Sequence, residues 1–169
     1  MSFKPMLTAL FDQAREWTPE QFLEPQIAET RQVEGLQSEG RVRNLVIGID
    51  EPLSFGGTDR APNPVEVTLA ALGASLEVTC RVYADYLGIP VHKISTVVRG
   101  DLDLRGFLDL DPQVRAGPPS LAVTLRIESE ASDADIDRLV RQVHRSCPVL
   151  SLVRDPTPVS LTVERPTSA

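Results

Sequence analysis

The sequence contains few cysteines and no long apolar run. Its two cysteines, Cys80 and Cys147, are too few for the disulfide framework of a small secreted protein. No segment approaches the apolar length of a membrane-spanning helix. Asp12, Arg15 and Glu16 interrupt the region where a signal peptide would have its apolar core. We therefore expect a cytoplasmic protein with no membrane association.

Clustered basic residues are also missing. The chain has 17 Lys and Arg against 24 Asp and Glu, for a formal net charge of −7. Because nucleic-acid-binding proteins normally carry a basic face, this composition argues against a nucleic-acid partner. A length of 169 residues, 41% of them hydrophobic, is sufficient for one globular domain with its own core.

Residues 1–25 are expected to form an N-terminal helical arm, and residues 26–169 the main domain. Apolar residues recur at helical spacing at Phe3, Met6, Leu7, Leu10, Phe11, Ala14 and Trp17. Thr18, Pro19 and Gln21 resemble the start of a second, short helix that Pro25 interrupts. Two interpretations remain open. The arm lies over the body or a partner subunit as a functional surface, or it covers the core of its own chain.

Strand-like sequences follow at residues 28–37 and 41–50, and Ser38-Glu39-Gly40 predicts the hairpin loop between them. Residues 51–64 are rich in Gly, Pro, Asp and Asn, which indicates a loop. The spacing of Gly56 and Gly57 fits neither common phosphate-binding motif.

The most informative segment is an expected helix over residues 64–87, capped by Asn63 and Glu66 and ended by Gly88. It would be about 36 Å long. Because it is apolar nearly all round as far as Val78, we expect its first half to be buried on every side, with a second subunit helping to cover it.

The remaining chain predicts strands at 91–98, 101–110, 121–129 and 159–163, separated by a loop at 111–120 and a helix from about Ser132. The apolar face of that helix contains Ile136, Leu139, Val140 and Val143. No regular strand–helix alternation occurs, so the expected class is α+β with mainly antiparallel sheet.

Cys147 continues the apolar face of this helix and precedes Pro148, which disfavours helical geometry at Cys147 and suits the start of another turn. The end of the first helix would raise the thiol pKa, whereas an N-cap position on the next would lower it. From position alone, a reactive cysteine and a buried structural cysteine both remain open.

Together, the element order, the segment GGTDRAPNPVEVTLAALGASLEVT and the CPV motif at 147–149 resemble the OsmC/Ohr family. The resemblance covers roughly residues 28–163. It implies an OsmC-like α+β fold, an intertwined homodimer with the long helix buried at its centre. Many members are thiol-dependent peroxidases that reduce organic hydroperoxides during oxidative stress, without a cofactor.

The resemblance also assigns site residues. The family's resolving cysteine falls on Cys147, and its attacking cysteine, twelve residues after the Asn of the Asn-Pro pair, falls on Ser75. The peroxidases' glutamate falls on Val65, while other branches have a glutamate that matches Glu66. Arg31 is a candidate for the catalytic arginine.

Ser75 changes the expected chemistry, because peroxide reduction requires a thiolate that becomes a sulfenic acid. Cys80 lies about 140° further round the helix than Ser75, so it does not replace the missing thiol on the same face. It remains a second candidate partner for Cys147. Serine catalysis at Ser75 would need an adjacent base, and the chain has only His92 and His144.

Metal binding has little support, because His144 and Cys147 alone do not make a site. Three hypotheses remain. The protein is a divergent enzyme using Cys147 with or without Cys80, a non-catalytic dimer that binds an apolar small molecule, or an interaction protein acting through its arm. The sequence predicts a poor peroxidase by the usual route.

Overall fold

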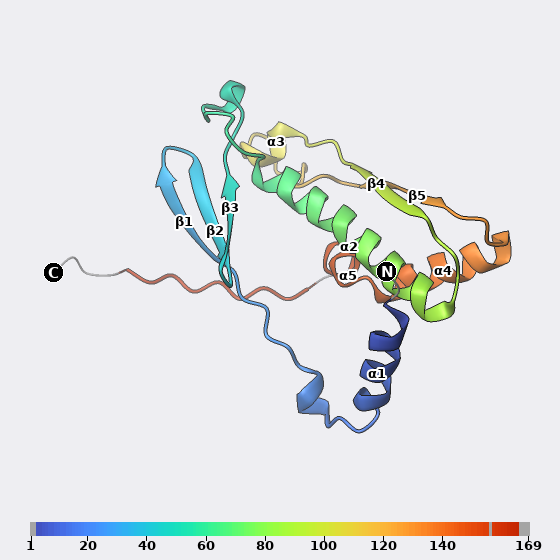
Figure 1. Ribbon diagram of the computed structural model, residues 1–169. Coiled ribbons are helices and arrows are strands. Elements are labelled where there is room, and N and C mark those ends of the chain that lie inside the picture. Colours follow the sequence, from blue (N-terminus) through green and yellow to red (C-terminus); the bar gives the residue numbers. More distant parts are fainter. Residues whose placement is uncertain (1–2, 156, 166–169) are drawn as a thin grey trace.

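The computed structural model describes residues 3–155 and 157–165 and shows a mixed α+β fold with two antiparallel sheets (Figure 1). This confirms the expected fold class. The α-helices are α1 (Lys4–Ala14), α2 (Pro64–Leu87), α3 (Leu104–Phe107), α4 (Asp133–Ser146) and α5 (Pro148–Arg154). The strands are β1 (Glu29–Glu34), β2 (Gln37–Val42), β3 (Leu45–Ile49), β4 (Lys93–Arg99) and β5 (Ala122–Glu128). Short 3-10 helices occur at Pro19–Phe22 and Leu53–Phe55.

The long helix α2 has the bounds that its capping residues predict. The Asn63 side chain accepts a hydrogen bond from the Glu66 backbone N–H at 2.9 Å, and the Glu66 carboxylate accepts one from the Asn63 N–H at 2.8 Å. Gly88 ends the helix with a φ of +71°, the left-handed conformation that favours glycine. Within residues 3–155 and 157–165, every helix is too short or too polar to cross a lipid bilayer.

The hydrophobic core lies where α2 meets β4, α4 and α5. Its buried members include Leu72, Leu76 and Cys80 of α2 and Leu139 and Val143 of α4. Within the single chain the first half of α2 is not buried on every side, and its expected coverage by a second subunit stays a prediction. Val78 is 63% exposed, and Ala70 and Ala74 are also exposed, because other elements cover only the face that carries Leu72 and Leu76.

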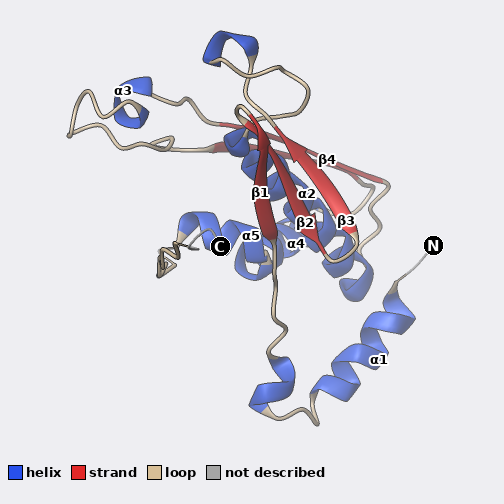
Figure 2. Ribbon diagram, turned by 90° about the vertical axis from the view of Figure 1, so that its left-hand side faces the viewer, coloured by secondary structure: helices blue, strands red, loops and turns tan. Residues whose placement is uncertain are grey.

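Strands β1, β2 and β3 form a three-stranded antiparallel sheet to one side of α2 (Figures 1 and 2). The predicted loop at residues 38–40 is wrong, because these residues lie within β2 and pair with β3. The two turns fall at residues 35–36 and 43–44. Gly35 and Arg43 there have φ values of +53° and +57°, the left-handed conformation that two-residue hairpin loops require.

Strands β4 and β5 pair in the second sheet, with Ile94 opposite Ile127. The strand expected at residues 101–110 is wrong, because the short helix α3 occupies part of this segment. Asp103 caps α3, accepting a hydrogen bond from the Arg105 N–H at 3.0 Å. Hydrogen bonds from the Arg105 side chain lower the pKa of Asp103 to about 2. This local cap overrides the apolar alternation of the segment.

The expected strand at residues 159–163 is also not formed. Residues 157–165 run away from α5 as an extended segment without a paired strand (Figure 1). Val159, Leu161 and Val163 are 88%, 87% and 74% exposed. An alternating sequence forms a strand only where a sheet edge is within reach, and the described part of this chain brings none to it.

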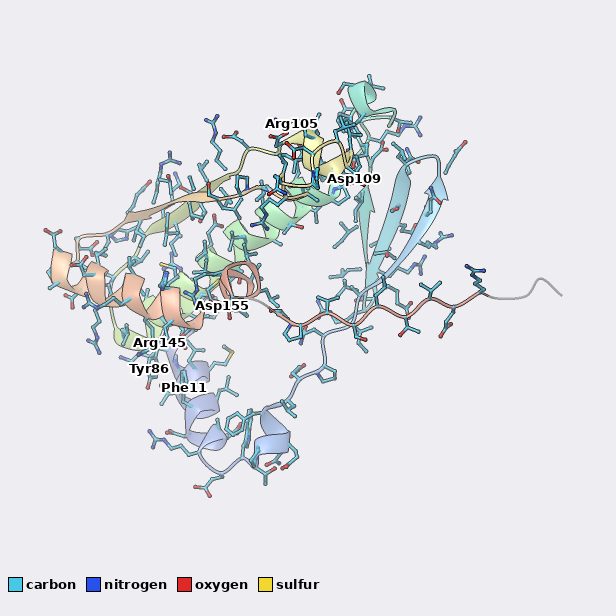
Figure 3. All side chains as sticks on the ribbon, turned by 180° about the vertical axis from the view of Figure 1, so that it is seen from behind. Phe11, Tyr86, Arg105, Asp109, Arg145 and Asp155 are labelled. Carbon is cyan, nitrogen blue, oxygen red and sulfur yellow. The ribbon has the colours of Figure 1, made fainter. Side chains whose placement is uncertain are left out.

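The N-terminal arm packs on the end of α2. The rings of Phe11 and Tyr86 are 4.5 Å apart between centroids (Figure 3), and the Phe3 N–H donates a hydrogen bond to the Asp85 carboxylate at 2.6 Å. Leu7 is buried. Thr18 and Gln21 form the expected capping box, on a 3-10 helix. Within the chain, the arm therefore covers its own body.

Asp50, just after β3, organises the loop that leads to α2. It is 1% exposed, and its Oδ2 accepts hydrogen bonds from the Thr58 hydroxyl at 2.7 Å and from the N–H groups of Thr58 and Arg60 at 3.1 Å each. These bonds, that of the Thr58 hydroxyl first, hold the pKa of Asp50 well below its ordinary value.

We expect Asp50→Asn to lower the melting temperature by several degrees at pH 7. A carboxyl whose pKa is lower when folded stabilises the protein above its unfolded pKa of about 3.9, and this contribution is lost as the pH falls. The difference from wild type should therefore shrink toward pH 3, as followed by circular dichroism. Asp137→Asn, on an exposed position of α4, is the control. Equal melting temperatures of Asp50→Asn and wild type at pH 7 would contradict this role.

Candidate functional site

Cys147 lies at the junction of α4 and α5. Its backbone N–H donates to the Val143 carbonyl at 3.0 Å and closes α4, while Pro148 begins α5. The ψ angle of Cys147 is 116°, an extended geometry that the following proline favours. The side chain is buried, with 2% exposure. The expected interruption of the helix at Cys147 is thus confirmed.

Ser75 is the polar neighbour of this thiol. Its Oγ lies 3.2 Å from the Cys147 Sγ, across 72 residues of sequence. The contact arises because α2 packs against α4 and α5. The Ser75 carbonyl also accepts a hydrogen bond from the Thr79 hydroxyl at 2.7 Å. The structure therefore brings together the two positions at which the family resemblance places its cysteines, hereafter the Ser75–Cys147 pair.

Cys80 lies in the same core but does not form a disulfide. Both cysteines are free, and no hydrogen bond joins them in the part of the chain that the structure describes. Cys80 is fully buried, and this desolvation raises the pKa of its thiol to about 11. Because the thiolate is the nucleophile, Cys80 is unsuited to attack a peroxide near neutral pH.

Glu66 and Arg31 are placed elsewhere. The Glu66 carboxylate caps the start of α2, as described above. Arg31, on β1, is exposed, and its guanidinium lies 3.4 Å from the Glu39 carboxylate. Among the described residues, no hydrogen bond or ion pair connects Glu66 or Arg31 to the Ser75–Cys147 pair.

The two histidines do not reach the pair either. His92 contacts Glu130, and a His144 ring nitrogen lies 3.3 Å from the Arg154 guanidinium. Neither contact supplies a base to Ser75, so the arrangement does not support serine catalysis. Within residues 3–155 and 157–165, no three His, Cys, Asp or Glu side chains are grouped to hold a metal ion.

An apolar groove of about 540 Å³ lies beside the pair, hereafter the α2–α5 groove. Leu72 is one helical turn from Ser75, and Leu150 is one turn from Cys147. The apolar lining of the groove includes Leu69, Leu72, Leu121, Val123, Leu150 and Val153. Arg115 and Arg154 are its charged residues. Neither this groove nor Arg115 is predicted from the sequence, because the walls of the groove come from separate segments and no local pattern marks them.

Comparison with known proteins identifies the family. A family model described as "OsmC-like protein" matches residues 57–162. No curated protein matches the chain. An OsmC-like protein from Mycoplasma pneumoniae has a similar structure, with 16% identity, a TM-score of 0.68, and coverage of 78% of this chain and 89% of that chain.

Two further structures are named organic hydroperoxide resistance proteins. The one from Legionella pneumophila is 22% identical, with a TM-score of 0.55 and coverage of 79% of this chain and 91% of its own. The one from Elizabethkingia anophelis is 18% identical, with a TM-score of 0.56 and coverage of 79% and 90%. At these identities the structures demonstrate a common fold. Because the family model spans more than half of the sequence, the chain belongs to the OsmC-like protein family.

Proposed function

We propose that this protein is an OsmC-like family member that has lost the attacking thiol of a hydroperoxide reductase. The observation that carries the proposal is the 3.2 Å contact between the Ser75 Oγ and the Cys147 Sγ. The resemblance places an attacking and a resolving cysteine at these positions. The names of the relatives from Legionella pneumophila and Elizabethkingia anophelis support organic hydroperoxides as the class of molecule concerned.

The chemistry explains why serine disables this route. A thiolate attacks one peroxide oxygen, the O–O bond breaks, and an alcohol leaves while the sulfur becomes a sulfenic acid. A second thiol then displaces water to form a disulfide, which a dithiol reduces. A serine hydroxyl is far less acidic than a thiol and has no equivalent of the sulfenic acid step. Cys147 therefore has no thiol partner at Ser75.

The direct test is the dithiothreitol-driven loss of cumene hydroperoxide. We expect wild-type protein to add nothing to the rate of dithiothreitol alone. Wild-type turnover that disappears in Cys147→Ser or Cys80→Ser would overturn the proposal, because these two thiols would then carry the chemistry.

A second candidate function is the non-catalytic binding of an apolar small molecule. The α2–α5 groove favours it, because the groove is largely apolar. Native mass spectrometry of the purified protein would detect a retained ligand. Deleting residues 1–25 should leave that ligand bound, whereas loss of a protein partner on this deletion would favour the third hypothesis, an interaction surface on the arm.

The proposed working form is a homodimer, as the family resemblance implies. Exposed apolar residues in three regions of the single chain support it. The exposed side of α2 carries Val78, and β3 leaves Leu45, Val46 and Ile47 43–58% exposed. The extended segment 157–165 adds Leu161, at 87% exposure. Exposed apolar surfaces of this kind are typical of association sites. A second copy would present the same apolar side of α2 and the same unpaired strand edges.

We expect light scattering to give twice the chain mass of 18.5 kDa. Leu161→Asp should weaken the dimer at least about tenfold, because burying a leucine side chain contributes about 1.5–3 kcal/mol. Thr162→Asp, which faces the other way on an extended chain, is the matched control. A monomer at all concentrations tested, or equal effects of the two variants, would contradict this assembly.

A further inference from the structure

We propose that the α2–α5 groove binds an amphipathic monoanion, with its apolar tail against α2 and α5 and its carboxylate at Arg115. The inference rests on the second candidate function, the binding of an apolar molecule, and names the chemical class of the ligand. It does not depend on any reaction at the Ser75–Cys147 pair.

The shape and lining of the groove fit the tail of such a ligand. Its volume of about 540 Å³ lies within the range of about 300–1,000 Å³ typical of small-molecule sites. Aliphatic side chains from both helices line it, with Leu69 and Leu72 from α2 and Leu150 and Val153 from α5. A chain of methylene groups placed there would lose water contact on several sides, which favours binding.

Arg115 supplies the charge for the head group. Its side chain makes no ion pair or hydrogen bond with the residues at 3–155 and 157–165. By contrast, the guanidinium of Arg154, the other arginine in the groove, lies 2.8 Å from the Asp155 carboxylate. Of the two arginines in the groove, Arg115 is therefore the one without a partner among the described residues, and a guanidinium binds a carboxylate through two parallel hydrogen bonds.

The backbone around Arg115 is held by close packing. A methyl group at Gly106 would lie 2.2 Å from the Arg115 carbonyl oxygen, so the loop approaches α3 more closely than any other residue at 106 would allow. The Arg115 Nη2 lies near Gly117, where an added methyl would be 3.7 Å away. The close approach at Gly106 holds the backbone of the loop that presents the arginine, which lowers the entropic cost of binding.

The linings of the other cavities fit an amphipathic monoanion less well. One of about 360 Å³, lined by Leu87, Arg138, Arg141, Gln142 and Arg145, offers positive charge but only one apolar side chain to contact a tail. A cavity of about 440 Å³ elsewhere along α2 is lined by Glu66 and Glu77, which would repel a carboxylate. A third, of about 550 Å³ beside α1, contains Glu77 together with Arg81, His92 and Lys93, but each of the basic groups has a partner. The Arg81 guanidinium donates hydrogen bonds to the Val91 and His92 carbonyls, the Lys93 Nζ lies 3.6 Å from the Glu128 carboxylate, and the His92 ring contacts Glu130. The lining of the α2–α5 groove contains no acidic residue.

The test compares octanoate with 1-octanol by isothermal titration calorimetry on the full chain at low salt. We expect Arg115→Gln to raise the Kd for octanoate about tenfold, since it removes a charge-assisted hydrogen bond, and to leave octanol binding unchanged. Arg126→Gln, an exposed arginine on β5 outside the groove, should change neither. Salt should weaken octanoate binding only.

A second pair of variants tests the location of the tail. Val153 and Val140 are each 42% exposed on a helix, but only Val153 lines the groove. Val153→Asp should raise the Kd for octanoate more than tenfold, and Val140→Asp should leave it unchanged. If Arg115→Gln and Arg126→Gln bound octanoate with equal affinity, the anion proposal would be overturned. Binding of octanol in that case would support the apolar site alone. No binding of either compound would overturn both.

Discussion

Ser75→Cys is expected to convert a protein without hydroperoxide turnover into one that reduces cumene hydroperoxide at the expense of a dithiol. The Ser75 Oγ and the Cys147 Sγ are already 3.2 Å apart, and a disulfide needs its sulfurs at about 2.05 Å. Side-chain rotation and the longer C–S bond can close much of that gap without moving either helix. The substitution also supplies the thiol that forms the sulfenic acid, which Cys147 then resolves with release of water.

Two measurements check this prediction. Oxidation with one equivalent of hydroperoxide should leave one free thiol per Ser75→Cys chain, that of Cys80, because the introduced cysteine pairs with Cys147. Ala74→Cys is the matched control, since it adds a thiol at the neighbouring exposed position of α2. It should show neither the disulfide nor turnover.

Combining Ser75→Cys with Cys147→Ser should abolish the disulfide. Failure of Ser75→Cys to form the disulfide would contradict the proposed pairing of these positions. A disulfide formed without turnover would instead show that the site lacks more than the attacking thiol.

Leu139→Ala is expected to destabilise the protein by about 2–5 kcal/mol, the range for removing a buried leucine side chain. Leu139 is fully buried, on the face of α4 that packs against α2. For a chain of this length the melting temperature should fall by about 4–20 °C. Leu139 lies about two helical turns before Cys147, so the cavity left by this substitution should also loosen the packing around the Cys147 side chain.

Thermal and urea unfolding followed by circular dichroism measure this effect. Val140→Ala is the control, because Val140 is the next residue on the helix but is 42% exposed. Its free energy of unfolding should change by less than about 1 kcal/mol. Similar losses in the two variants would mean that the α4 face carrying Leu139 is not the one that packs on the core. Faster reaction of Cys147 with a thiol reagent in Leu139→Ala alone would confirm the link to the site.

The elements that were correctly predicted are those set by neighbouring residues. Asn63, Glu66 and Gly88 specify both ends of α2, and Ser132 starts α4 through its hydrogen bond with the Asp135 N–H. Pro148 fixes the break in the helix at Cys147. Each signal acts within one or two turns, through a hydrogen bond or a steric restriction that the local sequence already contains.

The wrong predictions came from apolar patterns read without their surroundings. Residues 101–110 alternate like a strand, but the Asp103 cap forms a helix there. Residues 159–163 alternate as well, yet the described chain offers them no sheet edge. The turn expected at residues 38–40 lies instead at Gly35 and Arg43, because the turn position depends on which residues adopt positive φ values.

The sequence by itself determined the α+β class, the bounds of the two main helices and, through the family resemblance, the pairing of Ser75 with Cys147. Only the tertiary structure showed that these side chains touch, that Cys80 is fully buried with a raised pKa, and that Glu66 and Arg31 lie elsewhere. It also created the α2–α5 groove and placed Arg115 beside it, with no partner among the described residues. Local propensities act over a few residues, whereas a site made by α2, α5 and a distant loop exists only once packing brings those segments together.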